Sequence, residues 1–264
     1  MIQRMITGIV LIGVGLFIIW EGGLYLQVWM GLVGLVIAYE CIKMGKSRNL
    51  SAFPWLIYPL VILSIASVTC SYFDLLWNSV YWQIFTLIIL ASFLFELLSP
   101  RLFWVSSPLS YSARIILLIC FTLPYVSLLR NSENGLLYTS ICFLVIWSTD
   151  IMALFGGKKF GKHALSKLSP QKTIEGTLIG IGSSVAVICL WASQSDRPVL
   201  NWAVLALAIS AVAQLGDLHE SRVKRFFKIK DSGQLLPGHG GFYDRADSTL
   251  FVFPIFYIFT KVLL

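Results

Sequence analysis

Apolar stretches recur along the whole of this 264-residue chain, and they constrain its fold more than any other feature. Each stretch has roughly 16–20 residues, which is long enough, or nearly so, to cross the hydrocarbon layer of a membrane as a helix. A mean hydropathy of +0.81 excludes an ordinary soluble domain. The sequence therefore predicts an all-α, polytopic membrane protein. Its predicted transmembrane helices, about nine in number, lie at residues 5–20, 24–42, 55–73, 79–98, 114–130, 135–155, 174–193, 201–219 and 248–263.

The Lys and Arg residues gather in alternate connections between these stretches. If the N-terminus lies in the cytoplasm, all of the 20 Lys and Arg residues fall in cytoplasmic segments except Arg130, Arg197 and Lys261. Short cytoplasmic connections carry an excess of positive charge in membrane proteins. We therefore expect an integral protein of a bacterial-type inner or plasma membrane, with a polar site that faces the cytoplasm and an external C-terminus.

The polar chemistry divides the chain into two regions. Residues 1–130 are predicted to form about five membrane helices that carry little of it. Residues 131–264 are predicted to form the catalytic membrane region, with about four spans and cytoplasmic loops at 156–173 and 220–247.

Two carboxylates of the first region fall near the cytoplasmic ends of predicted helices. We expect Glu40 and Glu96 to lie at the membrane interface or to pair with Lys43 and Arg101.

Residues 221–247 form the most polar segment of the chain. They include six of the 20 basic residues, and the sequence GHGG is followed there by DRAD. Basic groups neutralise phosphates, carboxylates hold cations, and glycines such as Gly240 and Gly241 let backbone N–H groups approach oxygens. A solvated cytoplasmic loop would explain the basic residues but not GHGG and DRAD, so the segment predicts a site for a polyanion. Because most basic residues lie in connections that set the topology, no nucleic-acid binding is expected.

Carboxylates before and after this segment suggest a metal site. Asp217, Ser221 and Lys224 are spaced four and three residues apart, so they share a face if the eighth predicted helix continues through Lys224. A bound cation would offset the unfavourable position of Asp217 near a helix C-terminus. Asp244 and Asp247 begin the last predicted span, where one of them could simply cap the helix. Together with Asp217 they fit Mg²⁺, whereas the three His residues lack paired zinc-ligand spacing.

A second Gly- and Lys-rich segment follows Asp150. Residues 156–162, GGKKFGK, partly match a phosphate-binding P-loop, but His163 stands where Ser or Thr is required and no strand precedes. An ATPase P-loop is therefore rejected. The segment can still cradle phosphate through its N–H and ammonium groups.

The segment Gly216–Ser248 closely resembles the signature of the phosphatidate cytidylyltransferase (CDP-diglyceride synthetase) family. The matching positions are Ser221, Lys224-Arg225, Lys230-Asp231, Pro237, His239-Gly240-Gly241 and Asp244-Arg245-Ala246-Asp247. Residues 160–176 look like a second conserved loop of the family. The chain departs from the family pattern after Asp150, where Met152 and Leu154 replace the usual Gly and Tyr. This departure puts in doubt any backbone approach or ring stacking at those two positions.

The resemblance implies the reaction of CTP with phosphatidate, held in the bilayer among membrane lipids, to give CDP-diacylglycerol and pyrophosphate. It implies Mg²⁺, with a second cation and a homodimer left open. The implied catalytic residues are Lys224, Arg225, Lys230, Asp231, His239 and Arg245, the substrate-binding ones Asp150, Lys162, Lys172, Ser221, Gly240 and Gly241, and the metal ligands Asp217, Asp244 and Asp247. For His239 a structural turn, and for Lys162 and Lys172 interfacial anchoring, are the alternatives.

Three other functions remain as alternatives. They are a divergent enzyme that acts on another lipid phosphate, a non-catalytic membrane scaffold, and an anion transporter. A transporter normally has broken helices and polar residues near the middle of the membrane, whereas the polar residues here gather at predicted helix ends.

Overall fold

The computed structural model describes residues 13–69, 76–99, 105–235 and 240–263. Residues 13–21 are helical. The elements that follow are α2 (Gly23–Lys46), α3 (Pro54–Ala66), η1 (Ser67–Thr69), α5 (Val80–Phe95), α6 (Pro108–Cys120), α7 (Pro124–Arg130), α8 (Gly135–Phe160), β1 (Ala164–Ser166), β2 (Ser169–Thr173), α9 (Ile174–Gln194), α10 (Val199–Phe226) and α11 (Tyr243–Leu263). The prediction of an all-α protein is confirmed apart from the antiparallel hairpin β1–β2.

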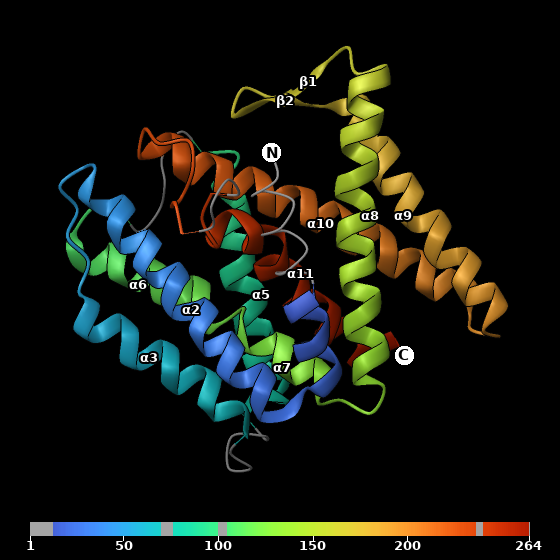
Figure 1. The fold of residues 1–264 in the computed structure, drawn as a ribbon, viewed down its shortest axis with the longest axis horizontal. Coiled ribbons are helices and arrows are strands. Elements are labelled where there is room, and N and C mark those ends of the chain that lie inside the picture. Colours follow the sequence, from blue (N-terminus) through green and yellow to red (C-terminus); the bar gives the residue numbers. More distant parts are fainter. Residues whose placement is uncertain (1–12, 70–75, 100–104, 236–239, 264) are drawn as a thin grey trace.

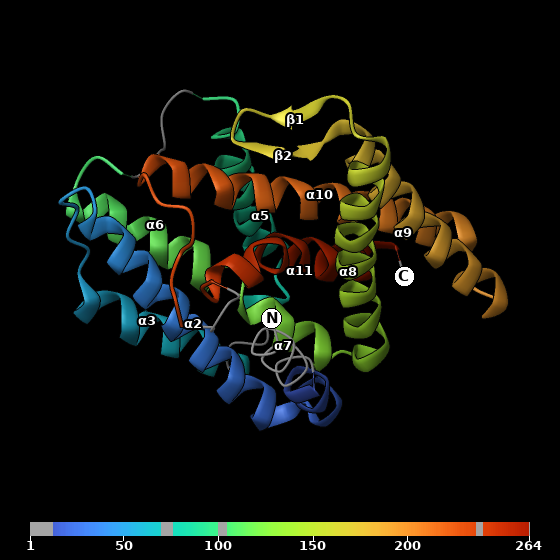
Figure 2. The same ribbon diagram turned by 45° about the horizontal axis from the view of Figure 1, so that its top comes forward.

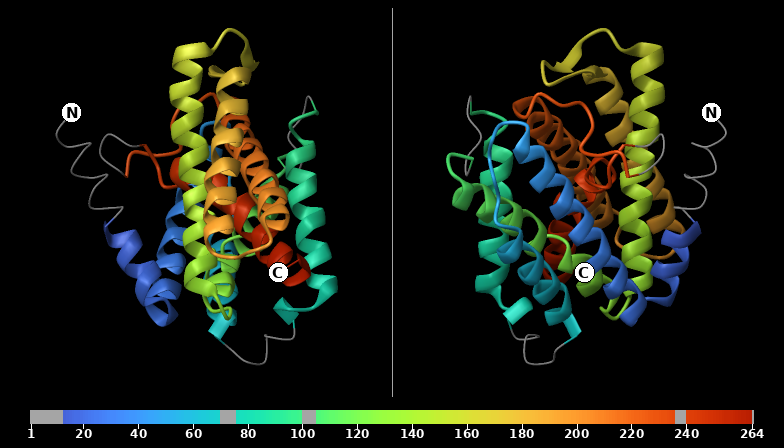
Figure 3. Two further views of the ribbon diagram at one scale, coloured as in Figure 1. Left: turned by 90° about the vertical axis from the view of Figure 1, so that its right-hand side faces the viewer. Right: turned by 60° about the vertical axis from the view of Figure 1, so that its left-hand side comes forward.

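Two groups of helices meet along α10 and α11. On one side α8 and α9 lie side by side, with the hairpin at their shared end (Figure 1). On the other side α2 packs against α3, α6 and α7 (Figure 2). Between them α10 contacts α8, α9 and α11, and α11 in turn contacts α5 and α7 (Figure 3). The helices α10 and α11 therefore lie between the α8–α9 group and the group formed by α2, α3, α6 and α7.

Proline sets the start of several helices. Pro54, Pro108 and Pro124 each stand in the first turn of a helix, where the missing N–H costs no hydrogen bond. Pro124 begins α7 within the predicted span 114–130. A turn at residues 121–123 separates α6 from α7, and together they remain one stretch, Pro108–Arg130, long and apolar enough to cross a membrane.

The two predicted cytoplasmic loops are shorter than expected. Within 156–173, α8 continues to Phe160 and the hairpin occupies most of the remainder. Within 220–247, α10 continues to Phe226 and α11 begins at Tyr243. The condition that α10 pass through Lys224 is therefore met.

Five helical stretches among the described residues are long and apolar enough to cross a membrane. They are Gly23–Lys46, Pro108–Arg130, Gly135–Phe160, Ile174–Gln194 and Val199–Phe226. The apolar helices α3 and α5 are shorter, and half of the predicted first span, 5–20, lies outside the described residues. The count of about nine spans stays a prediction.

Candidate functional site: a polar cavity at the α10–α11 corner

A cavity of about 850 Å³ opens between α8, β2, α10 and α11. It collects residues that are far apart in the sequence. The predicted site residues that line it are Asp150, Lys172, Asp217, Asp244, Arg245 and Asp247. Gln171, Gln214 and Lys158 add further polar groups to its wall. The cavity therefore joins the Gly- and Lys-rich segment to the signature segment, Gly216–Ser248.

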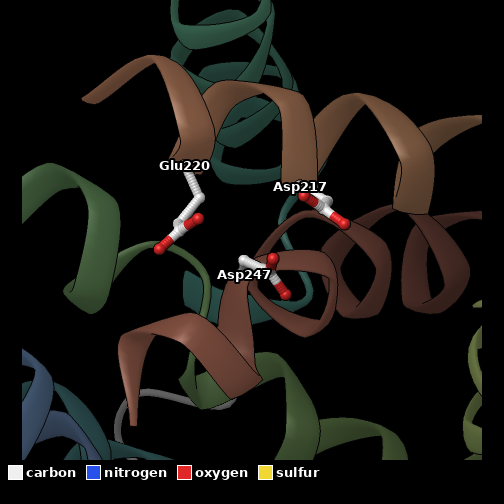
Figure 4. Close-up of side chains that lie close together, drawn as sticks. All are labelled: Asp217, Glu220 and Asp247. Carbon is white, nitrogen blue, oxygen red and sulfur yellow. The ribbon is translucent and has the colours of Figure 1, made fainter. Parts of the chain in front are cut away.

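Three carboxylates converge beside this cavity. One oxygen from each of Asp217, Glu220 and Asp247 lies within 4.8 Å of the others. Asp217 and Glu220 project from one turn of α10, and Asp247 faces them from α11 (Figure 4). Glu220 is buried, and its Oε1 has no hydrogen-bond partner among the described residues. An orphaned buried oxygen within an all-carboxylate donor set fits a hard cation such as Mg²⁺.

Glu220 was missed in the sequence analysis. Its spacing was a usable signal, because a residue three positions after Asp217 lies one turn further along the same helix face.

A chain of polar contacts crosses the cavity wall from α8 to α10. Gln214 on α10 donates from Nε2 to Asp150 Oδ1 at 3.5 Å, and its Oε1 accepts from Lys172 Nζ at 3.3 Å. Lys172 also forms an ion pair with Asp217. Lys172 thus connects strand β2 to the three-carboxylate cluster and is placed to meet an anion bound there. Gln214 was not identified from the sequence.

Lys224 joins the cluster to the start of α11. Its Nζ lies 2.6 Å from Glu220 Oε2 and 2.7 Å from Asp244 Oδ1. Asp244 Oδ2 accepts hydrogen bonds from the Ser232 N–H (2.9 Å), the Ser232 hydroxyl (3.0 Å) and the Gly241 N–H (2.8 Å). Both oxygens of Asp244 are thereby occupied. Glu220, and not Asp244, belongs to the three-carboxylate cluster, and the assignment of Asp244 as a metal ligand stays a prediction.

The remaining predicted site residues that the structure describes are not among those that line the cavity. Lys162, Arg225, Lys230 and Asp231 are exposed on the described surface. Ser221 is buried on α10. The Gly241 N–H already donates to Asp244, so it is not free for a phosphate. Gly240 has a φ of 84°, which a residue with a side chain rarely adopts. His239 lies outside the described residues.

The expectation that Glu96 and Glu40 reach a membrane interface is wrong, because both are buried. Arg101, one of the two expected partners, lies outside the described residues. Glu96 is fully buried and accepts from Arg114 at 2.5 Å, and Arg114 lies 2.9 Å from His219 Nε2 on α10. Glu40 is likewise buried, and it accepts hydrogen bonds from the signature segment. Both carboxylates therefore brace the α10–α11 corner from the N-terminal helices. Hydropathy alone could not reveal these partners, because they are far away in the sequence.

A second, mainly apolar cavity of about 540 Å³ adjoins the polar one. The two share Phe143, Trp147, Asp150, Arg245 and Thr249. Leu26, Trp29, Met30 and Val33 of α2 line the apolar part. Of the two residues that depart from the family pattern, Leu154 lines the polar cavity and Met152 is exposed on α8.

The apolar helices and this site define an integral membrane protein. Its site combines carboxylates with basic side chains and lies where α10 ends and α11 begins. Comparison with known proteins places it more narrowly. Residues 2–263 match the model of the cytidylyltransferase family, and the chain belongs to this family.

Several relatives are similar over nearly the whole chain. The phosphatidate cytidylyltransferase of Bacillus subtilis is 34% identical over 261 residues, covering 97% of this chain and 96% of that protein. That of Brucella abortus is 35% identical over 273 residues, covering 98% and 93%. That of a Synechocystis species is 47% identical over 137 residues, covering 51% of this chain and 47% of the relative. The resemblance stated from the signature segment is confirmed.

Proposed function

We propose that this protein condenses CTP with phosphatidate to give CDP-diacylglycerol and pyrophosphate, as the names of its full-length relatives suggest. The observation that carries the proposal is the cluster Asp217, Glu220 and Asp247 at a polar cavity that also contains Lys172 and Arg245. A nucleotide triphosphate with its bound cation needs this combination of carboxylates and cationic groups.

Asp217, Glu220 and Asp247 would hold Mg²⁺, which when bound supplies charge neutralisation for the triphosphate. The phosphate monoester of the lipid attacks the α-phosphorus of CTP while pyrophosphate leaves. Because that monoester is largely ionised near neutral pH, the protein must mainly position the two substrates and neutralise charge.

The basic residues of the cavity have separate tasks in this proposal. Lys172 exchanges its contact with Asp217 for a phosphate oxygen. Arg245, exposed at the cavity wall, offers the bidentate geometry that suits a phosphate. Lys224 keeps Asp244 and Glu220 in place. The exposed residues outside the cavity lining remain candidates for contact with the approaching substrates. They are Arg225, Lys230 and Asp231, and also Lys162, which lies between α8 and β1.

The adjoining apolar cavity gives a lipid substrate a place beside the polar groups. Phosphatidate would keep its phosphate near Asp150 and Arg245 and an apolar part near Trp29 and Met30. The apolar lining supports this placement, because it keeps the acyl chains out of water, where exposing each CH₂ group would cost about 0.8 kcal/mol. The substrate would then react without leaving the membrane environment.

We further propose the finer topology of about nine spans, a cytoplasm-facing site and an external C-terminus. The distribution of Lys and Arg supports it. A reporter fused after Leu264 should then be active only outside the cytoplasm, whereas a cytoplasmic signal would shift the span count by one. A homodimer stays a prediction, which the molecular mass of the purified protein in detergent would test.

The decisive experiment is turnover by purified protein in detergent or liposomes with CTP, phosphatidate and Mg²⁺. CDP-diacylglycerol and pyrophosphate should appear in equal amounts. Turnover with another lipid phosphate alone would favour the divergent enzyme. Absence of any turnover in folded protein, with or without transport of an anion, would favour the transporter or the scaffold.

A further inference from the structure

Glu40 lies in α2, far from the signature segment in sequence, yet it meets that segment with both carboxylate oxygens. Its Oε1 accepts from the Phe242 N–H at 3.0 Å. Its Oε2 accepts from the Tyr243 N–H at 2.9 Å and from the Ser232 hydroxyl at 3.0 Å. Glu40 is 1% exposed, so these contacts are shielded from water.

These contacts hold the beginning of α11. The first N–H groups of a helix have no partner within the helix, and an anion is favourable beside them. Glu40 supplies an acceptor for two such N–H groups from a different helix. Glu40 of α2 therefore caps the N-terminus of α11. The capped N–H groups lie about one helical turn before Asp247.

The backbone of the signature segment fits closely around this carboxylate. A Cβ added to Gly233 would lie 2.5 Å from Glu40 Oε1, and one added to Gly241 would lie 2.6 Å from both carboxylate oxygens. Real Cβ atoms essentially never approach other atoms so closely. The Glu40 carboxylate thus disfavours a side chain at Gly233, and together with the Ser232 hydroxyl it disfavours one at Gly241.

The same end of α2 contacts the end of α10. The Ser47 hydroxyl donates to the Phe227 carbonyl at 3.0 Å, and the Arg48 guanidinium lies 4.3 Å from the centre of the Phe226 ring. The end of α2 therefore holds both helices that carry the three-carboxylate cluster.

We propose that Glu40 is a positioning residue of this enzyme: it fixes the signature segment and the start of α11, so that Asp247 faces Asp217 and Glu220. The inference builds on the proposed function, but it assigns catalytic importance to a residue of the N-terminal region. A misplacement near 1 Å can lower turnover roughly 10²-fold.

The first test replaces Glu40 by Gln, which keeps the shape but exchanges one acceptor oxygen for a donor. Glu133→Gln is the matched control, because Glu133 is exposed before α8. We expect kcat per folded molecule to fall about 10- to 100-fold in Glu40→Gln and to stay at the wild-type level in the control. We also expect faster tryptic cleavage after Lys228 and Lys230, read by mass.

The tryptic readout requires no activity, so it separates this inference from the proposed function. If the wild type fails to turn over CTP with phosphatidate, the proposed function fails, and the cleavage rates still test the position of Glu40. Wild-type kcat together with wild-type cleavage in folded Glu40→Gln would overturn the inference.

The second test couples two sites and does not depend on Glu40→Gln folding well. Gly233→Ala places a methyl group against the Glu40 carboxylate, so it should lower kcat and expose the segment to trypsin. In a Glu40→Ala background the clash is removed, and Gly233→Ala should add little further loss. Equal fold-losses from Gly233→Ala in both backgrounds would overturn the inference.

If Glu40→Ala does not fold, Ser232→Ala takes its place as the milder probe, because it removes the hydroxyl donor to Glu40. Tryptic cleavage after Lys230 should then be faster than in the wild type. Unchanged cleavage would overturn the proposal.

Discussion

Two groups of carboxylates lie next to each other at the α10–α11 corner, and they differ in what their oxygens meet. The oxygens of Glu40 and Asp244 accept hydrogen bonds from backbone N–H groups, from Ser232 and from Lys224. The second group, Asp217, Glu220 and Asp247 of the cluster, has oxygens that converge on one another.

The difference assigns separate tasks to acidic residues that look alike in the sequence. Carboxylates saturated by N–H donors stabilise one backbone arrangement. Carboxylates brought together repel each other even though Lys172 and Lys224 each pair with one of them, and a cation relieves that repulsion. Asp244 and Asp247 are only three residues apart, yet Asp244 belongs to the first kind and Asp247 to the second.

The largest expected effect distinguishes these two tasks at the cluster itself. Asp217→Asn and Asp247→Asn each keep the side-chain shape but remove a negative ligand, so turnover should fall about 10²- to 10³-fold in protein that remains folded. The double variant should be far less than additively worse, because both residues act through one cation. Raised Mg²⁺ should partly restore each single variant. Near-normal turnover of Asp217→Asn would remove Asp217 from the metal site.

An intermediate effect is expected at Asp244. Asp244→Asn weakens its pairing with Lys224 and its hydrogen bonds from Ser232 and Gly241, so turnover should fall roughly tenfold through misplacement of the signature segment. Raised Mg²⁺ should not restore it, and tryptic cleavage after Lys230 should increase. Restoration by Mg²⁺ would return Asp244 to the metal site and remove the contrast between the two groups.

The smallest effect is expected at Lys230, which is exposed and outside the cavity lining. Lys230→Ala should lower turnover a few-fold with little loss of folded protein, because a surface ammonium contributes modest, screened attraction for phosphates. Lys43→Ala, an exposed lysine of α2, is the control. Measuring both variants at low and high salt tests the cause, and equal turnover of Lys230→Ala and wild type at low salt would leave Lys230 as a solvated loop residue.

Part of the site was predictable because local spacing decides it. Asp217 lies on a continuous α10, Lys172 comes from the predicted polar connection, and Asp150 lies in the predicted span just before it. Glu220 could have been found by extending the same helical spacing from Asp217. In contrast, the role of Asp244 depends on the Ser232 and Gly241 N–H groups, which reach it only when the segment between α10 and α11 folds back.

The sequence by itself determined the membrane class, the helical fold and the family signature, because hydropathy and short-range spacing are properties of neighbouring residues. Only the tertiary structure decided which carboxylates gather and which are saturated. Glu40 and Glu96 appeared as interfacial residues from hydropathy, but packing buries them against partners more than a hundred residues away, Phe242 and His219. Burial makes an unpaired charge costly, so each of these carboxylates lies where the fold supplies donors. Such donors come from distant segments, and no local pattern records them.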